Sequence, residues 1–419
     1  MLSTAVVLAG GTSRRFGTDK LDAVLAGGTL LQTTLAALPA AVDVVVVGPE
    51  RPTARTVRFV REDPPGGGPA AALVTGLSAA LAGGADLVAV LPADAPAAGR
   101  AAAELLRRLA GKPAVSALVA VDEEGRVQPL QLALRRDAAA ALVAAAVAGG
   151  QGASARRLVA TLQPPAEEVR LSPETLFDID TPAQLAVWHA SRSAAVESLL
   201  TLLERIRRTD GSPVVLALDG RGGAATATLA AAVALRTPAV VVPGRDFAPE
   251  DSAAEDPGPG DFLADASSAG SAPHPPAVRS VPDEPEAAAT ALDWARLRAE
   301  ALEPLVAGRV ARYRPSDRAR PTGERAGPGS GLVRTLHPAP VVVVEGVDSA
   351  RPELADLVTV AVLLRAAGDR RAQRPDARGD AVALGSLGER GERHPLITVL
   401  TPADLGLVIE EEIGHEHGA

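Results

Sequence analysis

Short apolar runs alternate with alanine-rich stretches of helical length along the first half of the chain. The apolar runs predict strands at Ala5–Leu8, Val44–Val47, Val57–Val60 and Leu87–Leu91. The alanine-rich stretches predict helices at Leu30–Leu38, Pro69–Leu81 and Ala97–Leu109. Strands that are apolar throughout and separated by helices indicate a mainly parallel sheet covered by helices on both faces. The first half is therefore predicted to be an α/β domain.

Three more patterns complete this half. Val115–Val121 and Val127–Leu134 flank the polar residues Asp122–Gly125, which predicts a β-hairpin. Phe177–Ile179 predicts a further strand. Thr181 followed by Pro182 predicts the N-cap and first turn of a helix.

A second alternating unit follows an amphipathic helix predicted at Ala194–Arg208. Its predicted strands are Pro213–Leu218, Ala239–Val242 and Val341–Val344, and its predicted helices are Ala224–Leu235 and Ala287–Ala307. Residues 248–286 are rich in Pro, Gly, Ser and acidic side chains. We predict that this insert is disordered, because it cannot bury enough apolar surface to offset the entropy of ordering. The pattern therefore predicts a first domain at 1–190, a helical linker at 191–210 and a second domain at 211–419.

Composition narrows the functional classes. The chain has 419 residues, of which 47% are hydrophobic and 22% charged, as in ordinary globular proteins. A net charge of −9 argues against nucleic-acid binding, which requires a basic face. The lack of cysteine excludes disulfides and thiolate metal sites. The chain shows no membrane-spanning apolar stretch and no signal-peptide pattern, so we expect a cytoplasmic protein without membrane association.

Lysine is almost absent from the chain. Only two of the 42 basic residues are lysine, Lys20 and Lys112. Because the chain is also rich in Ala, Gly and Pro, we attribute the excess of arginine to a coding bias. A lysine that persists in such a chain is a candidate functional residue.

Lys20 ends a glycine-rich segment, Leu8-Ala9-Gly10-Gly11-Thr12-Ser13-Arg14-Arg15-Phe16-Gly17-Thr18-Asp19-Lys20, that directly follows the first predicted strand. Glycines at the carboxyl end of a strand let backbone N–H groups approach a phosphate. Ligands bind at this edge of open parallel sheets. Arg15 and Lys20 add positive charge for a triphosphate and for a leaving pyrophosphate. The spacing matches neither the dinucleotide fingerprint nor the Walker A pattern.

Carboxylates are expected at the same sheet edge. Asp94 follows the predicted strand Leu87–Leu91. A Mg²⁺ ion that bridges phosphate oxygens needs one or two protein carboxylates, which Asp94 with Asp180, or with Asp178, would supply. The structural alternatives are a helix N-cap for Asp94 and a strand-end turn for Asp178.

The segment Leu8–Lys20 resembles the signature L-A-G-G-x-S-x-R-x-G-x-D-K of the molybdenum cofactor guanylyltransferases, within the nucleotidyltransferase superfamily, and meets it at every fixed position. Three later segments resemble further motifs in the family's order: Glu62–Pro69, Leu91–Pro96 and Phe177–Pro182. The resemblance implies a Rossmann-like nucleotidyltransferase domain at 1–190.

The resemblance also implies an activity: transfer of GMP from GTP to the molybdopterin-type molybdenum cofactor, with Mg²⁺ as cofactor and release of pyrophosphate. The residues it implies in nucleotide binding are Leu8, Ala9, Gly10, Gly11, Lys20, Asp63, Gly68, Pro69 and Asp94. Those implied in catalysis are Arg15, Lys20 and Asp94, and those implied in metal binding are Asp94 and Asp180, with Asp178 as the alternative.

The chain departs from the family pattern at two places. Ala72 stands where family members often have a second glycine. The late motif carries aspartates where some guanylyltransferases have asparagines, and this form is similar to the cytidylyltransferase branch. CTP therefore stays open as the nucleotide. Gly10 favours the guanine branch, because cytidylyltransferases typically read L-A-A-G at this position.

A second glycine loop, Asp219–Leu229, follows a predicted strand and opens a predicted helix, which is the context of a P-loop. Ala225, Thr226 and Ala227 stand where that pattern requires Gly, Lys and Ser or Thr. This half resembles a uridine kinase-like domain at Asp246-Phe247 and several later segments. We therefore predict a degenerate, inactive P-loop-type α/β domain with a disordered insert. An active nucleoside kinase and a nucleotide-binding regulatory protein are the alternatives.

Overall fold

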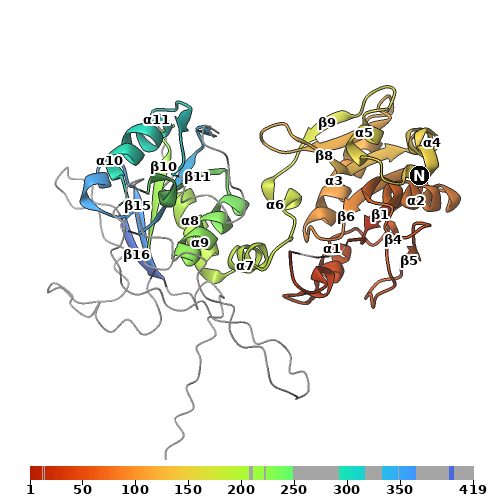
Figure 1. The fold of residues 1–419 in the computed structure, drawn as a ribbon, viewed down its shortest axis with the longest axis horizontal. Coiled ribbons are helices and arrows are strands. Elements are labelled where there is room, and N and C mark those ends of the chain that lie inside the picture. Colours follow the sequence, from red (N-terminus) through yellow and green to blue (C-terminus); the bar gives the residue numbers. More distant parts are fainter. Residues whose placement is uncertain are drawn as a thin grey trace, which may run out of the picture. The chain divides into compact units, whose positions relative to one another are not determined.

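The computed structural model describes residues 1–11, 13, 15–206, 211–220, 223–248, 292–316, 333–347, 349–364 and 396–400 (Figure 1). The chain divides into two compact units. The first contains Met1–Glu204 and Ala231–Pro238, and the second contains Arg205–Ala230 and the described residues from Ala239 to Leu400. Within the described residues, no helix is long and apolar enough to cross a membrane.

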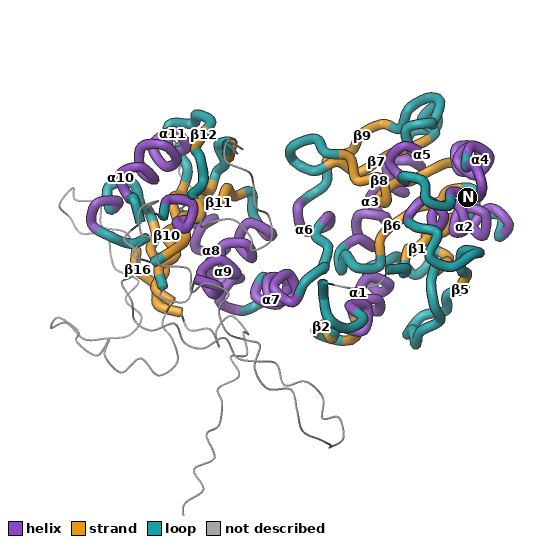
Figure 2. The backbone as a smooth tube through the Cα atoms, in the orientation of Figure 1, coloured by secondary structure: helices purple, strands orange, loops and turns teal. Residues whose placement is uncertain are grey.

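The first unit is built on a seven-stranded sheet with the strand order β5-β4-β1-β6-β8-β7-β9 (Figure 2). Its strands are β1 (Ser3–Leu8), β4 (Asp43–Val47), β5 (Arg58–Val60), β6 (Leu87–Pro92), β7 (Ala117–Val121), β8 (Val127–Arg135) and β9 (Glu167–Arg170). Strands β5, β4, β1 and β6 run parallel, whereas β8 is antiparallel to both of its neighbours. The predicted mainly parallel sheet and the predicted hairpin are both confirmed.

Helices follow the strands in the predicted order. They are α1 (Leu30–Ala36), α2 (Pro69–Ala82), α3 (Ala98–Ala110), α4 (Arg136–Ala145), α5 (Ala155–Val159), α6 (Pro173–Leu176), α7 (Pro182–Ala190) and α8 (Ala194–Arg205). A small antiparallel pair, β2 (Val24–Leu25) with β3 (Gly28–Thr29), precedes α1. Thr29 caps α1 in a reciprocal capping box with Gln32, and Thr181 caps α7 as predicted.

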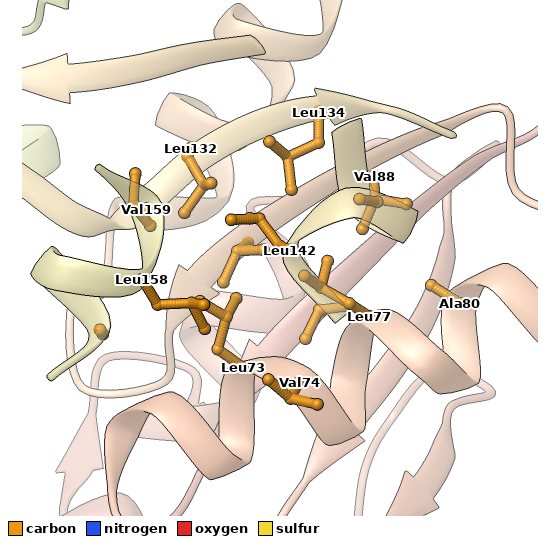
Figure 3. Close-up of a cluster of buried hydrophobic side chains, with 14 of the residues drawn as sticks. Leu73, Val74, Leu77, Ala80, Val88, Leu132, Leu134, Leu142, Leu158 and Val159 are labelled. Carbon is orange, nitrogen blue, oxygen red and sulfur yellow. The ribbon is translucent and has the colours of Figure 1, made fainter. Parts of the chain in front are cut away.

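Aliphatic side chains fill the core of this unit. Figure 3 shows the side chains of α2, α4 and α5 meeting those of β6 and β8. The labelled members are Leu73, Val74, Leu77, Ala80, Val88, Leu132, Leu134, Leu142, Leu158 and Val159. Ala5 and Val7 alternate with Val6 along β1, point to the opposite face, and are equally buried. Both faces of the sheet are therefore covered, which leaves its edges and strand ends for function.

The second unit contains a parallel sheet with the strand order β11-β14-β10-β15-β16. Its strands are β10 (Val214–Asp219), β11 (Ala239–Pro243), β14 (Val341–Gly346), β15 (Val360–Leu364) and β16 (Leu396–Leu400). The helix α9 (Gly223–Arg236) follows β10, and a two-stranded sheet pairs β12 (Ala311–Tyr313) with β13 (Arg334–Leu336). This α/β arrangement agrees with the predicted class of the second domain.

Three predictions about elements need correction or lie outside the described residues. The strand predicted at Phe177–Ile179 is wrong: the segment lies as a loop between α6 and α7, and its Ile179 N–H donates to the Asp94 carbonyl without forming a strand ladder. The predicted helix at 287–307 is described from residue 292 and is divided into α10 (Trp294–Leu297), a π-helical turn and α11 (Glu303–Val306). Of the predicted disordered insert 248–286, all but Ala248 lies outside the described residues.

Candidate active site

The candidate site begins where β1 and β6 end side by side. Leu8 pairs in register with Pro92, and the Ala93 N–H donates to the Leu8 carbonyl at 3.0 Å. The chain therefore leaves both strands at the same sheet edge, into the glycine loop after β1 and into Asp94 after β6. This is the edge at which parallel α/β sheets bind ligands.

The glycine loop exposes its backbone at this edge. Leu8 and Ala9 are buried, whereas Gly10 and Gly11 are exposed. Gly11 has a φ of 141°, a conformation that side chains disfavour. A Cβ atom at Gly10 would lie 3.9 Å from the Glu62 carboxylate, so the loop that begins at Glu62 is its neighbour. The two predicted nucleotide-binding loops thus lie close together.

Lys20 is held by its backbone as well as its side chain. Asp19 caps the short 3₁₀-helix Lys20–Asp22 by accepting the Leu21 N–H at 3.1 Å. The Lys20 N–H donates to Ser13 Oγ at 3.2 Å, which closes the glycine loop onto the start of this helix. The backbone of Lys20 therefore has a fixed position relative to the loop.

The Lys20 ammonium lies between two carboxylates. Its Nζ donates to Asp94 Oδ2 at 2.6 Å and also to Asp180 Oδ1. Desolvation lowers the pKa of Lys20, but the hydrogen bonds and charges of Asp180 and Asp94 outweigh it, so the pKa is raised above its ordinary value. Lys20 is therefore a cation across the physiological range, and it contacts two other predicted site residues, Asp94 and Asp180, that are far from it in the sequence.

Asp178 lies in the same electrostatic environment. Desolvation by the surrounding chain, followed by the charges of Asp180 and Asp94, raises the pKa of Asp178, although its side chain keeps an exposed surface.

The N-cap of α3 is Ala97, so the alternative interpretation of Asp94 as a helix cap is wrong. The carboxylate of Asp94 instead contacts the ammonium of Lys20.

The carboxylate pair fits a divalent metal ion in its charge and donor type. An ammonium already lies between Asp94 and Asp180, which shows that the pair accommodates a cation. Carboxylate oxygens are the ligands that Mg²⁺ prefers, and Mg²⁺ is commonly held by one or two of them together with substrate phosphates. Among the described residues, no cluster of three or more acidic or histidine side chains is arranged to hold a metal alone. A metal here would therefore take its remaining ligands from water or from a bound nucleotide.

Arg15 is the one predicted catalytic residue that lies apart from the ammonium–carboxylate cluster. It is exposed in the turn that precedes Gly17. Among the described residues, Lys20 forms hydrogen bonds with Ser13, Ala23, Asp94 and Asp180 and none with Arg15. Its predicted role in binding phosphate would need the side chain to extend over the glycine loop.

The second predicted loop leads into the N-terminus of α2. Gly68 is the N-cap residue, with a φ of 92° and no side chain to cap the helix, and Pro69 occupies the first helical position. Backbone N–H groups at such an uncapped start have no intrahelical partner and favour anionic ligands. Asp63 is exposed in the same loop. The chain conformation is thus compatible with ligand binding at this loop.

Residues that the sequence did not single out form hydrogen bonds with the backbone of the loop that precedes α2. The Gly152 N–H donates to the Gly67 carbonyl at 2.9 Å, and Gln151 Nε2 donates to the Pro64 carbonyl at 3.4 Å. A Cβ atom at Gly67 would lie 2.2 Å from Gln151 Oε1, so a larger residue there would displace the end of the Gln151 side chain. The Gly-Gln-Gly segment at 150–152 gave one sequence signal, its glycines, but no indication of which loop it would contact.

A buried threonine was also missed. Thr34 on α1 is fully buried, and its hydroxyl lies 3.0 Å from the Ala93 carbonyl and 3.2 Å from the Ala95 carbonyl. The carbonyl of Asp94 itself accepts the Ile179 N–H at 2.9 Å. The Leu30 carbonyl of α1 itself lies 3.1 Å from the same hydroxyl, so the hydroxyl's one hydrogen goes to one of these three carbonyls at a time. The backbone next to Asp94 therefore lies against Thr34, and the Asp94 carbonyl is held by the segment that carries Asp180.

An aromatic stack anchors that late segment. The rings of Phe177 and Trp188 stack with centroids 6.4 Å apart, and the Arg192 guanidinium lies 3.1 Å from the centroid of the Trp188 ring. Glu174 accepts a hydrogen bond from Arg192 at 2.6 Å. Burial lowers the pKa of Arg192 to about 10, so this guanidinium stays charged near neutral pH. The position of Asp178 and Asp180 thus depends on packing within the first unit.

The second glycine loop has a different environment. Thr226 and Glu345 are both buried, and Thr226 Oγ1 donates to Glu345 Oε2 at 2.9 Å. Residues 221 and 222 of the loop lie outside the described residues, as does the Arg-rich run at 365–378, which resembles the position of a phosphate-binding lid in uridine kinase-like domains. The missing P-loop lysine is a fact of the sequence, since Thr226 occupies its place.

Asp246, which matches part of a nucleoside-binding motif in the uridine kinase-like resemblance, forms contacts within the protein. Asp246 is 1% exposed, accepts the Tyr313 hydroxyl at 2.9 Å and pairs with Arg334 at 2.7 Å. Burial raises the pKa of Asp246, and the charge of Arg334 opposes this shift. The ring of Phe247 packs against Tyr313 at 4.6 Å. Every described contact of Asp246 is thus an internal one.

Comparison with known proteins assigns the first unit more closely than the second. The family model described as "MobA-like NTP transferase domain" matches residues 5–168, which is less than half of the chain. Over 119 residues the chain is 39% identical to the molybdenum cofactor guanylyltransferase of Acidiphilium cryptum, a match that covers 27% of this chain and 59% of that protein. Over 95 residues it is 43% identical to a protein of Opitutus terrae named "Probable molybdenum cofactor guanylyltransferase", covering 22% of this chain and 47% of that protein. The chain therefore spans about half the length of these curated relatives.

A solved structure is similar to part of the chain at low identity. The chain is 21% identical to molybdopterin-guanine dinucleotide biosynthesis protein A from Archaeoglobus fulgidus, with a TM-score of 0.34 and coverage of 43% of this chain and 94% of that one. A likeness at this level adds nothing to the assignment of a function.

Proposed function

We propose that the chain is a Mg²⁺-dependent nucleotidyltransferase that transfers GMP from GTP to the molybdenum cofactor and releases pyrophosphate. The observation that carries this proposal is the contact of the Lys20 ammonium with Asp94 and Asp180 at the sheet edge where the glycine loop begins. The family match over residues 5–168 and the names of the two curated relatives support the choice of nucleotide and acceptor.

The glycine loop and its two basic residues would bind the triphosphate. The exposed backbone of Gly10 and Gly11 offers N–H groups to phosphate oxygens, as in other glycine-rich anion sites. Lys20 would contribute its ammonium, and Arg15 its guanidinium, to the charge that develops on the leaving pyrophosphate. Leu8 and Ala9, both buried, set the position from which this loop departs.

The neighbouring loop would contact the nucleoside. Asp63 is exposed and offers a carboxylate to the donor groups of a guanine base. Gly68 and Pro69 begin α2 without a side-chain cap, so the backbone there is open to a ligand. These roles rest on the resemblance and on the closeness of this loop to Gly10.

Asp94 and Asp180 would hold the metal ion, with Asp178 as the alternative ligand. A bound Mg²⁺ supplies positive charge that neutralises the phosphate oxygens as the pyrophosphate departs. The protein's own part is to hold both carboxylates at the carboxyl edge of the sheet and to offer the Lys20 ammonium to the phosphates. A terminal phosphate oxygen of the molybdenum cofactor would form the new bond to the α-phosphorus of GTP. The bond from that phosphorus to the oxygen that bridges it to the β-phosphate would break, which releases pyrophosphate. Positioning and charge stabilisation supply the catalysis, because the incoming phosphate is already a competent nucleophile.

A substitution of Lys20 tests the proposal, with the chain's other lysine as its control. In the full chain with GTP, Mg²⁺ and molybdopterin, Lys20→Ala should reduce pyrophosphate release by about 10²- to 10³-fold. Lys112→Ala should leave it unchanged, because Lys112 is exposed and pairs with Glu167 at 2.6 Å. Full activity of Lys20→Ala, or no pyrophosphate from wild-type protein with any nucleoside triphosphate, would overturn the assignment.

CTP is the second candidate nucleotide. The late motif carries Asp178 and Asp180, the form that is similar to the cytidylyltransferase branch. Parallel assays with GTP and CTP at equal concentration decide between them: the ratio of kcat/KM values names the substrate. A preference for CTP would retain the reaction class and change the nucleotide.

For the second unit we propose no catalytic activity. The P-loop lysine position holds Thr226, whose hydroxyl is hydrogen-bonded to the buried Glu345. Incubation of the full chain with ATP and uridine should therefore produce no ADP above background. ADP formation that persists in Lys20→Ala would instead favour an active kinase in the second half.

A further inference from the structure

Arg51 lies in the loop after β4 and binds the segment that carries Lys20. Its guanidinium forms ion pairs with Asp19 and with Asp22, the latter at 2.8 Å between Nη1 and Oδ1. The Arg51 side chain is only 13% exposed, although one of its two partners, Asp22, is 62% exposed. The two partners flank Lys20 on either side in the sequence.

Asp19 links Arg51 to the backbone of the 3₁₀-helix that begins at Lys20. One of its oxygens pairs with Arg51, and the other accepts the Leu21 N–H at 3.1 Å. Asp22 is the last residue of the same 3₁₀-helix, and its carboxylate pairs with the other terminal nitrogen of Arg51. The 3₁₀-helix Lys20–Asp22 is thus fixed at both ends by one guanidinium, and the Lys20 side chain extends from it towards Asp94.

The electrostatic environment of Arg51 favours its charged form, paired with Asp19 and Asp22. Desolvation lowers the pKa of Arg51, but the hydrogen bonds and charges of Asp19 and Asp22 outweigh it and raise the pKa above its ordinary value. The Arg51 Nε–H is buried and finds no hydrogen-bond partner among the described residues. In the part of the chain that the structure describes, the buried Nε–H is therefore left without a partner, while both terminal nitrogens contact carboxylates. Lysine cannot reproduce this fork, since it offers a single nitrogen.

We propose that Arg51 is a positioning residue for Lys20: its fork on Asp19 and Asp22 holds the ammonium where it meets Asp94 and, during the proposed reaction, the nucleotide phosphates. This inference rests on the proposed function for its catalytic consequence. A misplacement of about 1 Å far from the reacting atoms can reduce a rate by about 10²-fold, so the effect of losing Arg51 is measurable.

Arg55, in the same loop, is the matched control. Its guanidinium is also engaged, but with backbone carbonyls of Leu35, Leu38, Pro39 and Val42 rather than with the Lys20 segment. Arg55→Met and Arg51→Met therefore remove the same chemical group from the same loop. Only the Arg51 substitution releases Asp19 and Asp22.

The two-lysine composition allows a direct measurement of Lys20. Protein grown with lysine labelled by ¹³C at the ε-carbon gives two signals, from Lys20 and Lys112, which Lys112→Ala assigns. In Arg51→Met we expect the Lys20 signal to move towards that of the exposed Lys112, and in Arg55→Met we expect it to stay. This readout needs no turnover, so it separates failure of the positioning inference from failure of the proposed function.

The kinetic arm uses pyrophosphate release by the full chain. We expect Arg51→Met to lower kcat/KM by about 10- to 100-fold, Arg51→Lys to restore little, and Arg55→Met to have at most a small effect. In a Lys20→Met background, Arg51→Met should cause no further loss, because both act through one ammonium. Asp22→Asn, a conservative change at an exposed partner, provides a well-folded variant with a smaller loss.

Three results would overturn the inference: an unmoved Lys20 signal in Arg51→Met, losses from Arg51→Met and Lys20→Met that multiply in the double variant, or an equal loss from Arg55→Met. A moved Lys20 signal in a protein that releases no pyrophosphate from GTP or CTP would support the positioning role and contradict the proposed function.

Discussion

The Lys20 ammonium lies 2.6 Å from the Asp94 carboxylate, although the two residues are separated by 74 positions in the chain. The same ammonium contacts Asp180. The proposal assigns these two carboxylates to a Mg²⁺ ion, so the ammonium and the metal ion compete for them. Binding of the nucleotide would resolve the competition, because its phosphates attract Lys20 away from the carboxylates while they supply the remaining metal ligands.

The competition predicts a gain of metal affinity when the ammonium is removed. Lys20→Met should bind Mn²⁺ at least about 10-fold more tightly than the wild type without nucleotide, because a unit charge at about 4 Å contributes up to about 4 kcal/mol near a protein surface. The measurement is the concentration of free Mn²⁺, followed by electron paramagnetic resonance during a titration. Lys112→Met is the control and should match the wild type, since Lys112 pairs with Glu167 on the surface. Equal or weaker binding by Lys20→Met would contradict the competition.

Thr34 provides a second prediction, on the position of Asp94. Its hydroxyl lies within hydrogen-bond distance of the carbonyls on both sides of Asp94. Thr34→Val keeps the shape but removes the single hydroxyl donor that these carbonyls share, which should lower the free energy of unfolding by about 1–3 kcal/mol. We also expect the Mg²⁺ concentration for half-maximal pyrophosphate release to rise by up to about 10-fold, as when other outer-shell partners of metal ligands are lost.

Thr34→Ser separates the hydroxyl from the methyl group. The serine keeps the hydrogen bond and should restore the wild-type dependence on Mg²⁺, even if the lost methyl group reduces stability. A serine variant that behaves like the valine variant in the Mg²⁺ titration would show that Thr34 acts through packing alone.

Local patterns predicted the parts of the site that follow strands. Apolar runs indicated the positions of β1 and β6, and parallel strands end at the same edge, so the sequence alone predicts that Gly10 and Asp94 lie near each other. The family resemblance added Asp180, which the chain brings to the same edge through a loop rather than through the strand predicted at 177–179.

The supporting residues could not be predicted, for a physical reason. Thr34 and Arg51 carry no motif, and each acts through contacts with residues distant in the sequence. Arginine is so frequent in this chain that Arg51 and Arg55 look alike in the sequence, whereas the first pairs with carboxylates and the second with carbonyls. Such contacts depend on the packing of loops, which no local periodicity records.

The position of Gly76 in α2 predicts that any larger side chain there would overpack the core. A Cβ atom there would lie 2.2 Å from a methyl group of Val6 and 2.9 Å from one of Val47, both fully buried. Gly76→Ala should lower the free energy of unfolding by about 1–3 kcal/mol through overpacking, although alanine is the better helix former. Unfolding in urea is followed by Trp188 fluorescence in a Trp294→Phe background, which reports on the first unit alone.

Gly111→Ala is the matched control for this substitution. Gly111 ends α3 with a φ of −77°, and its nearest neighbours would lie 3.6 Å or more from a new Cβ atom. Its stability should change little or rise by about 0.4–1 kcal/mol, because alanine restricts the unfolded chain. A Gly76→Ala variant as stable as Gly111→Ala would contradict the close packing of α2 on β1.

Glu345 predicts how the stability of the second unit varies with pH. The side chain is 5% exposed, and burial raises the pKa of its carboxyl, while the hydrogen bond from Thr226 opposes the shift. Between the ordinary pKa of 4.5 and the raised value, the folded chain holds a proton that the unfolded chain has released. The free energy of unfolding therefore falls as the pH rises through this window, by at most about 1.4 kcal/mol per pH unit for one proton.

Glu345→Gln should remove this part of the pH dependence. The glutamine can still accept the Thr226 hydroxyl, but it has no proton to lose, so its stability should stay level where that of the wild type falls. Urea midpoints at pH 5 and above, followed by Trp294 fluorescence in a Trp188→Phe background, measure the difference within the second unit. We expect the variant to gain on the wild type as the pH rises. Parallel pH profiles for the two proteins would mean that Glu345 has the same proton affinity folded and unfolded, and that its burial has no electrostatic consequence.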